Sequence, residues 1–255
     1  MGVLAKILAQ KESELAALRA RRLPAPPPRR PVALERASNA GRLSLITEIK
    51  RRSPSAGQLS TVLSVAERAR AYERGGASML SVLCDAHFFD GAYEHLQEAR
   101  AATSLPLLCK EFVVDEAQLD AARAFGADAV LLIVRCLTPE RTAALIRAAR
   151  ERDLVPFVEV ASEQELGTAL EAGAQLIGVN ARDLDTLVMD AERAARVLSA
   201  IPAQVTRAHL SGLSRPEDVL RIKAAGADAA LVGEALMRAD DPAPLLRALV
   251  DAAAT

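Results

Sequence analysis

The segment FGADAVLLIV, residues 125–134, has a Gly-Ala step, two further residues and then a short apolar run, and this pattern occurs four times in the chain. The other copies are GGASMLSVL (75–83), AGAQLIGVN (172–180) and AGADAALVG (225–233), so the aligned glycines lie 50, 47 and 53 residues apart. A glycine after an Ala- and Arg-rich stretch ends a helix, and the apolar run after it is a buried strand. The repeat therefore predicts four helix-to-strand junctions.

Four further apolar runs separate these junctions, at 43–50, 105–112, 154–160 and 203–210. Eight strands then alternate with helices, which requires parallel strands joined by right-handed crossovers. Eight such units in about 210 residues predict a closed (β/α)8 TIM barrel, an α/β fold. A doubly wound open sheet is the alternative. It more often carries a glycine-rich dinucleotide turn after its first strand, and RRSPSAG (51–57) is not one.

An N-terminal extension precedes the first strand. Residues 1–22 mix acidic with basic side chains and contain no signal-peptide core, so they are not a targeting peptide. They predict an amphipathic helix packed on the barrel, with apolar residues at helical spacing: Leu4, Ile7, Leu8, Leu15 and Leu18. LPAPPPRRP (23–31) then forces an extended connector. We therefore assign 1–42 to the N-terminal helical extension and its Pro-rich connector, and 43–255 to the barrel.

Composition narrows the possible partners. The chain has 255 residues, is 51% hydrophobic and 25% charged, and has a formal net charge of -1, which favours neither nucleic acid nor a membrane surface. No apolar run is long enough to span a bilayer. The three cysteines, Cys84, Cys109 and Cys136, lack metal-ligand spacing and lie in or beside apolar runs. We interpret them as reduced buried thiols of a cytoplasmic protein.

Charged and polar side chains gather at the predicted strand ends. In such barrels the functional site lies at the C-terminal ends of the strands. Burial disfavours a charged lysine, a nearby carboxylate favours it, and the balance can tune a general acid. Two lysines and two glutamates at one mouth therefore suit proton transfer. The strand-end residues, in chain order, are Glu48, Lys50, Asp85, Lys110, Arg135, Glu159, Asn180, Arg182, Ser211 and Gly233.

Two further features indicate a phosphorylated ligand with a ring. LSGLSRPED (210–218) and LVGEALM (231–237) each place a small residue between a strand and a helix. Backbone N–H groups at such turns bind phosphate, and barrels often have a phosphate site after strands seven and eight. Large apolar residues also follow strand ends and predict a pocket for an aromatic ring: Phe88, Phe89, Phe112 and Leu184.

Six motifs in barrel order resemble the indole-3-glycerol-phosphate synthase family. The resemblance covers nearly the whole chain, from the N-terminal helix to RADDP (238–242). The motifs are EIKRRSPS (48–55), SVLCDAHFFDG (81–91), PLLCKEFVVDEAQ (106–118), VEV (158–160), IGVNARDL (177–184) and LVGEALMRADDP (231–242).

The resemblance implies a lyase of tryptophan biosynthesis that closes an indole ring. Its substrate, 1-(2-carboxyphenylamino)-1-deoxyribulose 5-phosphate, loses CO2 and water, and no metal or organic cofactor takes part. We expect this small phosphorylated molecule as the partner, and a monomer or weak homodimer.

The resemblance also assigns roles to individual residues. Lys110 would be the general acid at the ketone oxygen, Lys50 would assist it or serve in dehydration, and Glu159 would be the base. Glu48 would set the lysine network, while Asn180, Arg182 and Ser53 would orient or hold the substrate. Phe89, Phe112, Leu131 and Leu184 would line the ring pocket. The phosphate would lie against Ser211, Gly212, Gly233 and Glu234, largely through their backbone.

Several positions depart from the family pattern. The family usually has Lys at Ala56, Asp at Glu111 and a second Asn at Ala181. More importantly, Leu210 stands where the resemblance implies an active-site glutamate. The adjacent His209 should point to the opposite face of its strand, which disfavours it as a replacement for that glutamate.

Two alternatives remain open from the sequence. One is a phosphosugar isomerase similar to phosphoribosylanthranilate isomerase, although the expected cysteine and aspartate acid–base pair is absent from suitable strand ends. The other is a catalytically weakened paralogue that binds a ligand or a partner subunit. Leu210 and Ala181 favour this reading, whereas Lys50, Lys110 and Glu159 oppose it.

Overall fold

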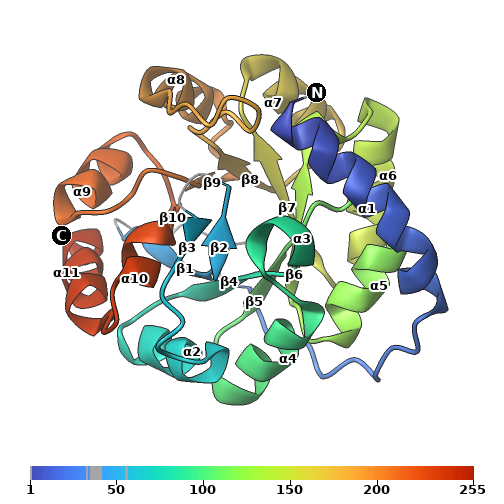
Figure 1. Cartoon of the computed structure of the whole chain (residues 1–255). Helices are drawn as coiled ribbons and strands as arrows, with labels where there is room; N and C mark the ends of the chain where they lie inside the picture. Colours follow the sequence, from blue (N-terminus) through green and yellow to red (C-terminus); the bar gives the residue numbers. More distant parts are fainter. Residues whose placement is uncertain (1, 33, 35–41, 55–56) are drawn as a thin grey trace.

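A computed structural model describes residues 2–32, 34, 42–54 and 57–255. In it, eight parallel strands form a closed barrel in the order β1-β10-β9-β8-β7-β6-β5-β4 (Figure 1). Helices surround the strands, and the predicted (β/α)8 barrel with its N-terminal helix is confirmed. The barrel strands are β1 (Ser44–Ile49), β4 (Met79–Leu83), β5 (Leu107–Lys110), β6 (Ala129–Ile133), β7 (Val155–Val160), β8 (Leu176–Val179), β9 (Thr206–His209) and β10 (Ala229–Val232).

The remaining elements connect these strands or extend from them. A short antiparallel pair, β2 (Arg52–Ser53) with β3 (Gly57–Gln58), follows β1 and was not predicted. The helices are α1 (Val3–Ala20), α2 (Val65–Arg74), α3 (Ala86–Phe89), α4 (Tyr93–Ala102), α5 (Glu116–Ala124), η2 (Val134–Cys136), α6 (Pro139–Glu151), α7 (Glu163–Glu171), α8 (Ala191–Ala200), α9 (Pro216–Ala224), α10 (Glu234–Arg238) and α11 (Ala243–Ala254).

The repeated Gly-Ala step ends four helices in the same way. Gly76, Gly126, Gly173 and Gly226 have φ values of 92°, 101°, 82° and 85°, a left-handed conformation that favours glycine. The N–H of the alanine that follows donates to the carbonyl five residues earlier, as from Ala77 to Tyr72 at 3.1 Å. Each strand then begins three residues after its glycine. One sequence pattern thus ends a helix and starts a strand four times.

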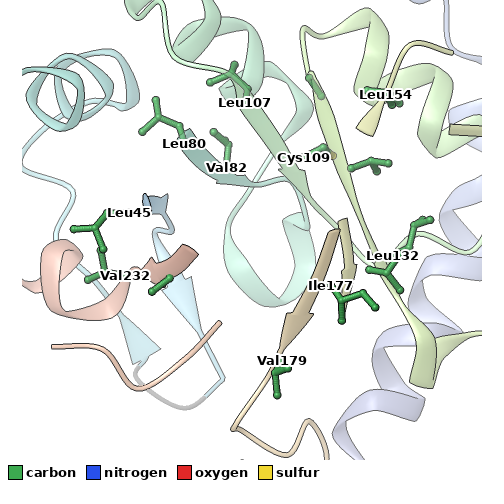
Figure 2. Close-up of a cluster of buried hydrophobic side chains, with 14 of the residues drawn as sticks. Leu45, Leu80, Val82, Leu107, Cys109, Leu132, Leu154, Ile177, Val179 and Val232 are labelled. Carbon is green, nitrogen blue, oxygen red and sulfur yellow. The ribbon is translucent and has the colours of Figure 1, made fainter. Parts of the chain in front are cut away.

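Side-chain alternation divides the core into two layers. Outward residues such as Leu80, Cys109 and Val179 pack beneath the helices (Figure 2). Inward residues such as Ile46, Leu108 and Phe157 fill the barrel. Because alternate residues of a strand share a face, the residues two positions further on, Glu48, Lys110 and Glu159, also point inward.

The N-terminal segment contacts both ends of the barrel. Helix α1 packs against α5 (Figure 1) and buries Leu4 and Ile7 beside the barrel interior. Residues 22–32 form neither helix nor strand, as the prolines predict. Val32 and Leu34 then pack into the inward core, and the Leu34 carbonyl accepts from the Thr206 hydroxyl at 2.6 Å.

The predicted boundary between extension and barrel at 42/43 stays a prediction, and within the extension residues 1, 33 and 35–41 lie outside the described residues. Within the described part of the chain, none of the helices combines the length and the apolar character that a bilayer crossing requires.

Asp128 joins the connector to the barrel. Its buried carboxylate accepts from the backbone N–H groups of Arg30 at 2.6 Å and Leu107 at 3.0 Å, and it pairs with the Arg100 guanidinium at 2.6 Å. Asp228 occupies the matching position in the last repeat, where it accepts from the N–H of Arg207 at 2.8 Å but is less buried.

We expect Asp128→Ala to lower the free energy of unfolding by about 3 kcal/mol, because it leaves a largely buried guanidinium and two N–H groups without their acceptor. Asp228→Ala is the matched control and should lose only about 1 kcal/mol. Urea unfolding followed by circular dichroism measures both. Equal losses would show that the connector contacts at Asp128 add nothing to stability.

Candidate active site

A cavity of about 450 Å³ opens at the C-terminal ends of the barrel strands. All eight barrel strands, or the residues directly after them, contribute to its wall. Phe88, named with the predicted ring pocket, does not line it, but every residue to which the family resemblance assigned a role does: Glu48, Lys50, Ser53, Phe89, Lys110, Phe112, Leu131, Glu159, Asn180, Arg182, Leu184, Ser211, Gly212, Gly233 and Glu234. The structure therefore brings the predicted set together, while the role of each residue stays a prediction.

A chain of acidic and basic groups crosses the floor of the cavity. Lys50 Nζ lies 2.8 Å from Glu48 Oε1. Lys110 Nζ lies 3.6 Å from Glu48 Oε2 and 4.0 Å from Glu159 Oε2. One buried carboxylate thus serves both lysines, and Lys110 also faces the second carboxylate at a longer distance.

Glu48 stays ionised because of these lysines. Burial alone would raise the pKa of its carboxyl group, but Lys50 and Lys110 outweigh burial and lower the pKa below its usual value. Glu48 is only 3% exposed, so its charge is held by protein cations rather than by water. The carboxylate can therefore orient both ammonium groups at neutral pH.

Asn180 and Ser211 extend the chain on the far side of Glu159. The Asn180 amide donates to Glu159 Oε1 at 2.9 Å. Its oxygen accepts from the Ser211 hydroxyl at 2.9 Å and from the Arg182 N–H at 3.0 Å. The Ser211 oxygen in turn accepts from the Ala181 N–H at 3.0 Å. The hydroxyl of Ser211 therefore fixes which way Asn180 presents its amide to Glu159.

One side of the cavity is apolar. The rings of Phe89 and Phe112 lie 6.0 Å apart with a tilt of 35°. Leu131 and Leu184 continue this wall, and α1 adds residues that the sequence had not assigned to the site, Val3 and Ile7. The arrangement suits a flat apolar ring.

The opposite side is formed by the turns after β9 and β10. Gly212 has a φ of 81°, so its turn needs glycine. Gly233 is required for another reason, because a Cβ there would lie 2.6 Å from Glu48 Oε1. The Glu234 carboxylate pairs with Arg238 at 2.8 Å, and both residues line the cavity.

Two of the strand-end charges do not line the cavity. Asp85 pairs with Lys11 of α1 at 2.7 Å. Arg135 is held between Glu165 at 2.9 Å and Asp183 at 2.8 Å. These two side chains support loops rather than face a substrate.

Comparison with known proteins identifies the family. The family model described as indole-3-glycerol phosphate synthase matches residues 4–249. The chain is 42% identical over 249 residues to the indole-3-glycerol phosphate synthase of Exiguobacterium sp., a match that covers 98% of this chain and 96% of that protein. It is 44% identical over 257 residues to indole-3-glycerol phosphate synthase 2 of Streptomyces coelicolor, which covers 98% and 99%.

The chain belongs to the indole-3-glycerol phosphate synthase family.

The comparison with solved structures supports the fold and nothing further. A 3-hexulose-6-phosphate synthase superposes with a TM-score of 0.66 at 19% identity, covering 82% of this chain and 99% of that chain. The thiamine phosphate pyrophosphorylase of Pyrococcus furiosus gives 0.63 at 19% identity, covering 84% and 96%.

The departures from the family pattern can be placed in the structure. Leu210 points into the mouth and lines the cavity. It packs directly against Gly178, because a Cβ atom added to that glycine would lie 2.5 Å from the Leu210 Cδ1 atom. His209 lies beside the outward residue Val179 and so faces away, as alternation predicts. Burial and the nearby Arg221 lower the pKa of His209 to about 4, which leaves it uncharged at neutral pH. Ala56 lies outside the described residues.

Glu111 and Arg238 also line the cavity, although sequence reasoning had not placed either in the site. Arg238 could have been predicted as a site residue from the sequence. It lies four residues after the predicted site residue Glu234 in the motif LVGEALMRADDP, and residues at this spacing are neighbours on a helix.

We expect Gly233→Ala to lower the kcat of the synthase reaction about 100-fold, because a misplacement of about 1 Å in a catalytic group has effects of this size. The new methyl group would displace Glu48 from both lysines. The φ of Gly233 is −128°, so this contact, rather than a left-handed backbone, causes the effect.

Gly167→Ala is the matched control, since a Cβ at Gly167 meets nothing within 4 Å. Steady-state kinetics of both variants, with circular dichroism to verify folding, gives the comparison. Near-normal kcat in Gly233→Ala would mean that the position of Glu48 is not critical.

Proposed function

We propose that this chain converts 1-(2-carboxyphenylamino)-1-deoxyribulose 5-phosphate into indole-3-glycerol phosphate, CO2 and water. The observation that carries this proposal is one cavity with an acid–base chain between an aromatic wall and two backbone turns. The family to which the chain belongs supports the same reaction.

The reaction forms one carbon–carbon bond and then eliminates two small molecules. The ring carbon that bears the carboxylate attacks the ketone carbon, while the ketone oxygen takes a proton from an acid. Loss of CO2 restores the aromatic ring. The new hydroxyl group then leaves as water with a second proton, and a base takes a proton from the adjacent CH2 group. The enzyme must therefore supply an acid at one oxygen and a base nearby.

Lys110 is the proposed acid at the ketone oxygen. Its Nζ lies between Glu48 and Glu159 at 3.6 and 4.0 Å, longer than hydrogen bonds, so it can turn toward a substrate. Lys50 is held more tightly, at 2.8 Å from Glu48, which suits a supporting role or the later dehydration. Glu159 is the proposed base, and Asn180 orients it through a 2.9 Å hydrogen bond.

The two ends of the substrate would lie on opposite sides of this chain. The benzoate ring fits the wall of Phe89, Phe112, Leu131 and Leu184. The phosphate fits the turns at 211–214 and 233–236, where backbone N–H groups and Arg238 favour an anion. Arg182 and Ser53 lie at the mouth and would orient the part between. This placement holds the ketone over Lys110.

We further propose a cytoplasmic location and a monomeric or weakly dimeric state. The three free cysteines support a reducing compartment. We propose that the protein binds this small phosphorylated substrate and neither nucleic acid nor a membrane, in keeping with a formal net charge of -1.

Purified protein and the carboxyphenylamino substrate should yield indole-3-glycerol phosphate, seen as the growth of indole fluorescence. We expect the rate to be unchanged after EDTA treatment and dialysis, because side chains and backbone fill the acid, base and phosphate roles. Loss of activity on chelation that a divalent ion restores would refute the cofactor-free mechanism. Tight substrate binding without product would instead favour a weakened paralogue.

Lys110→Ala should lower kcat by about 10²–10⁴-fold with a small effect on KM, because a proton donor acts in the transition state. Lys6→Ala, which removes an exposed lysine of α1, is the control and should leave both constants unchanged. Should Lys110→Ala keep its kcat while Lys50→Ala loses it, the acid role belongs to Lys50.

A further inference from the structure

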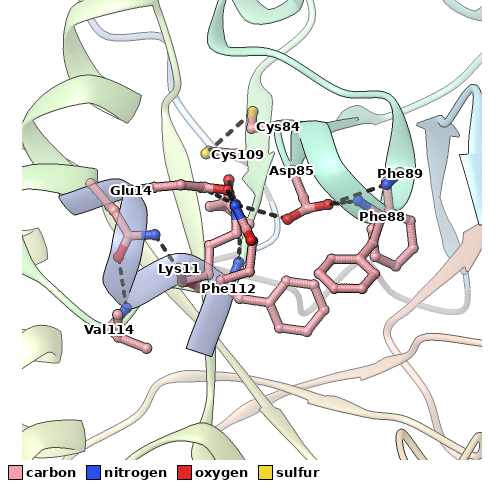
Figure 3. A network of polar contacts seen from close by, with 12 residues as sticks. Lys11, Glu14, Cys84, Asp85, Phe88, Phe89, Cys109, Phe112 and Val114 are labelled. Atoms are coloured by element: carbon pink, nitrogen blue, oxygen red, sulfur yellow. Dashed lines mark hydrogen bonds and ion pairs between the residues drawn. The ribbon is translucent and has the colours of Figure 1, made fainter. Parts of the chain in front are cut away.

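A buried ion cluster lies behind the aromatic wall and does not belong to the acid–base chain. Lys11 of α1 points its ammonium group between Asp85 and Glu111, as Figure 3 shows for Lys11 and Asp85. The distances are 2.7 Å to Asp85 Oδ2 and 3.2 Å to Glu111 Oε1, and Glu14 adds a contact of 2.8 Å. The three central residues are 2%, 0% and 3% exposed, so water does not hold these charges.

Each of the two buried carboxylates also fixes the backbone of a cavity-lining phenylalanine. Asp85 Oδ1 accepts from the N–H groups of Phe88 at 2.6 Å and Phe89 at 3.2 Å, which begins α3. Glu111 Oε1 accepts from the Phe112 N–H at 2.7 Å. The ammonium group therefore contacts the two carboxylates that set where the rings of Phe89 and Phe112 lie (Figure 3).

Holding α1 in place does not explain why this ammonium is buried. The first turn of the helix is tied by the Leu4 N–H to Asp185 at 3.3 Å, and its end by Arg19 to Asp115 at 2.7 Å. Surface contacts of this kind avoid the desolvation penalty of a buried charge. The burial of Lys11 is therefore better explained by its contacts with Asp85 and Glu111, the carboxylates that fix the backbone of Phe89 and Phe112.

We propose that Lys11 is a positioning residue for the substrate ring, acting through Asp85 and Glu111 on Phe89 and Phe112. The inference rests on the proposed function, since it assigns that aromatic wall to the benzoate ring. Lys11 itself does not line the cavity. Ile7, one turn earlier on the same helix face, does, so α1 both lines the ring side and orders it from behind.

The cluster carries more negative than positive charge, which makes Glu111 sensitive to pH. Burial raises its pKa, Lys11 opposes this and Asp85 adds to it, with a result of about 7. The other titratable groups that face the cluster are Glu14 of α1, the thiols Cys84 and Cys109, and the Tyr93 hydroxyl. Below pH 7 Glu111 takes up a proton, so its pair with Lys11 and its hydrogen bond from Phe112 both weaken.

The main test is Lys11→Met, which removes the charge at similar side-chain length. We expect kcat/KM to fall at least about 10-fold, while the inhibition constant of inorganic phosphate, which probes the opposite side of the cavity, changes less than about twofold. Lys11→Arg should restore part of the activity. Arg19→Met, which removes the exposed pair with Asp115 on the same helix, is the matched control and should keep normal kinetics.

Glu111→Gln provides a second test, the pH dependence of kcat/KM, which would not change if the cluster had only a structural role. The ratio of wild-type to Glu111→Gln kcat/KM should fall from about 10 at pH 8.5 to about 2 at pH 6, because only the wild type loses the charge at position 111 over this range. The ratio cancels the titration of the substrate. If Lys11→Met does not fold, Lys11→Gln replaces it in the same kinetic comparison, and this ratio is the second measurement beside it.

Active wild-type protein whose folded Lys11→Met variant keeps its kcat/KM would overturn the inference and leave the proposed function standing. A parallel rise in the phosphate inhibition constant would also overturn it, since that change indicates a general disturbance of the mouth. Inactive wild-type protein would count against the proposed function first.

Discussion

The Glu48 carboxylate is the contact on which the active site depends. The carboxylate is almost fully buried and bridges two ammonium groups, and it fits only because the residue directly after the neighbouring strand β10 is glycine, Gly233. A buried carboxylate without these cations would take up a proton, and the lysines would lose their common anchor. Each of the three residues comes from the inward face of β1 or β5, or directly follows β1. The site is thus a direct product of strand register, because shifting either strand by one residue would turn these groups outward.

Different kinds of structural element form the different sides of the cavity mouth, and each side has a different proposed chemical role. Strands, or the residues directly after them, supply the groups to which we assign proton transfer, and the rigidity of strands suits a geometry defined to within fractions of an ångström. The turns after β9 and β10 supply the backbone that we propose binds the phosphate. The apolar side combines residues of α1, of α3 and of the loop after β5 with Leu131 of β6 and Leu184 after β8. Only this side depends on a segment outside the barrel, so changes in the N-terminal helix should alter how the ring is held more than how the phosphate is held.

Sequence reasoning predicted much of this because the informative patterns are local. The Gly-Ala step marks a left-handed cap, and its repetition counts the strands. Alternation then places Glu48 inward and His209 outward without any tertiary knowledge. The Lys11 cluster was missed because its partners lie far along the chain, 100 residues away for Glu111. A signal did exist: Leu4, Ile7, Lys11 and Leu15 form one buried helical stripe, and a lysine within an apolar stripe indicates a buried partner. The β2–β3 pair was missed because two-residue strands leave no periodic pattern.

Helix α1 is synthesised before the surfaces that it covers, because it precedes them in the chain. Lys11 pairs with Asp85 and Glu111. Leu34 lies after the Pro-rich connector and packs into the barrel, where its carbonyl accepts a hydrogen bond from Thr206 of β9. The partners of Lys11 are therefore complete once Glu111 has been synthesised, whereas the Leu34 carbonyl finds its donor only once Thr206 has been synthesised. The Lys11 contacts behind the aromatic side thus form within the first half of the chain, whereas the Leu34 contact forms only when β9 has been made.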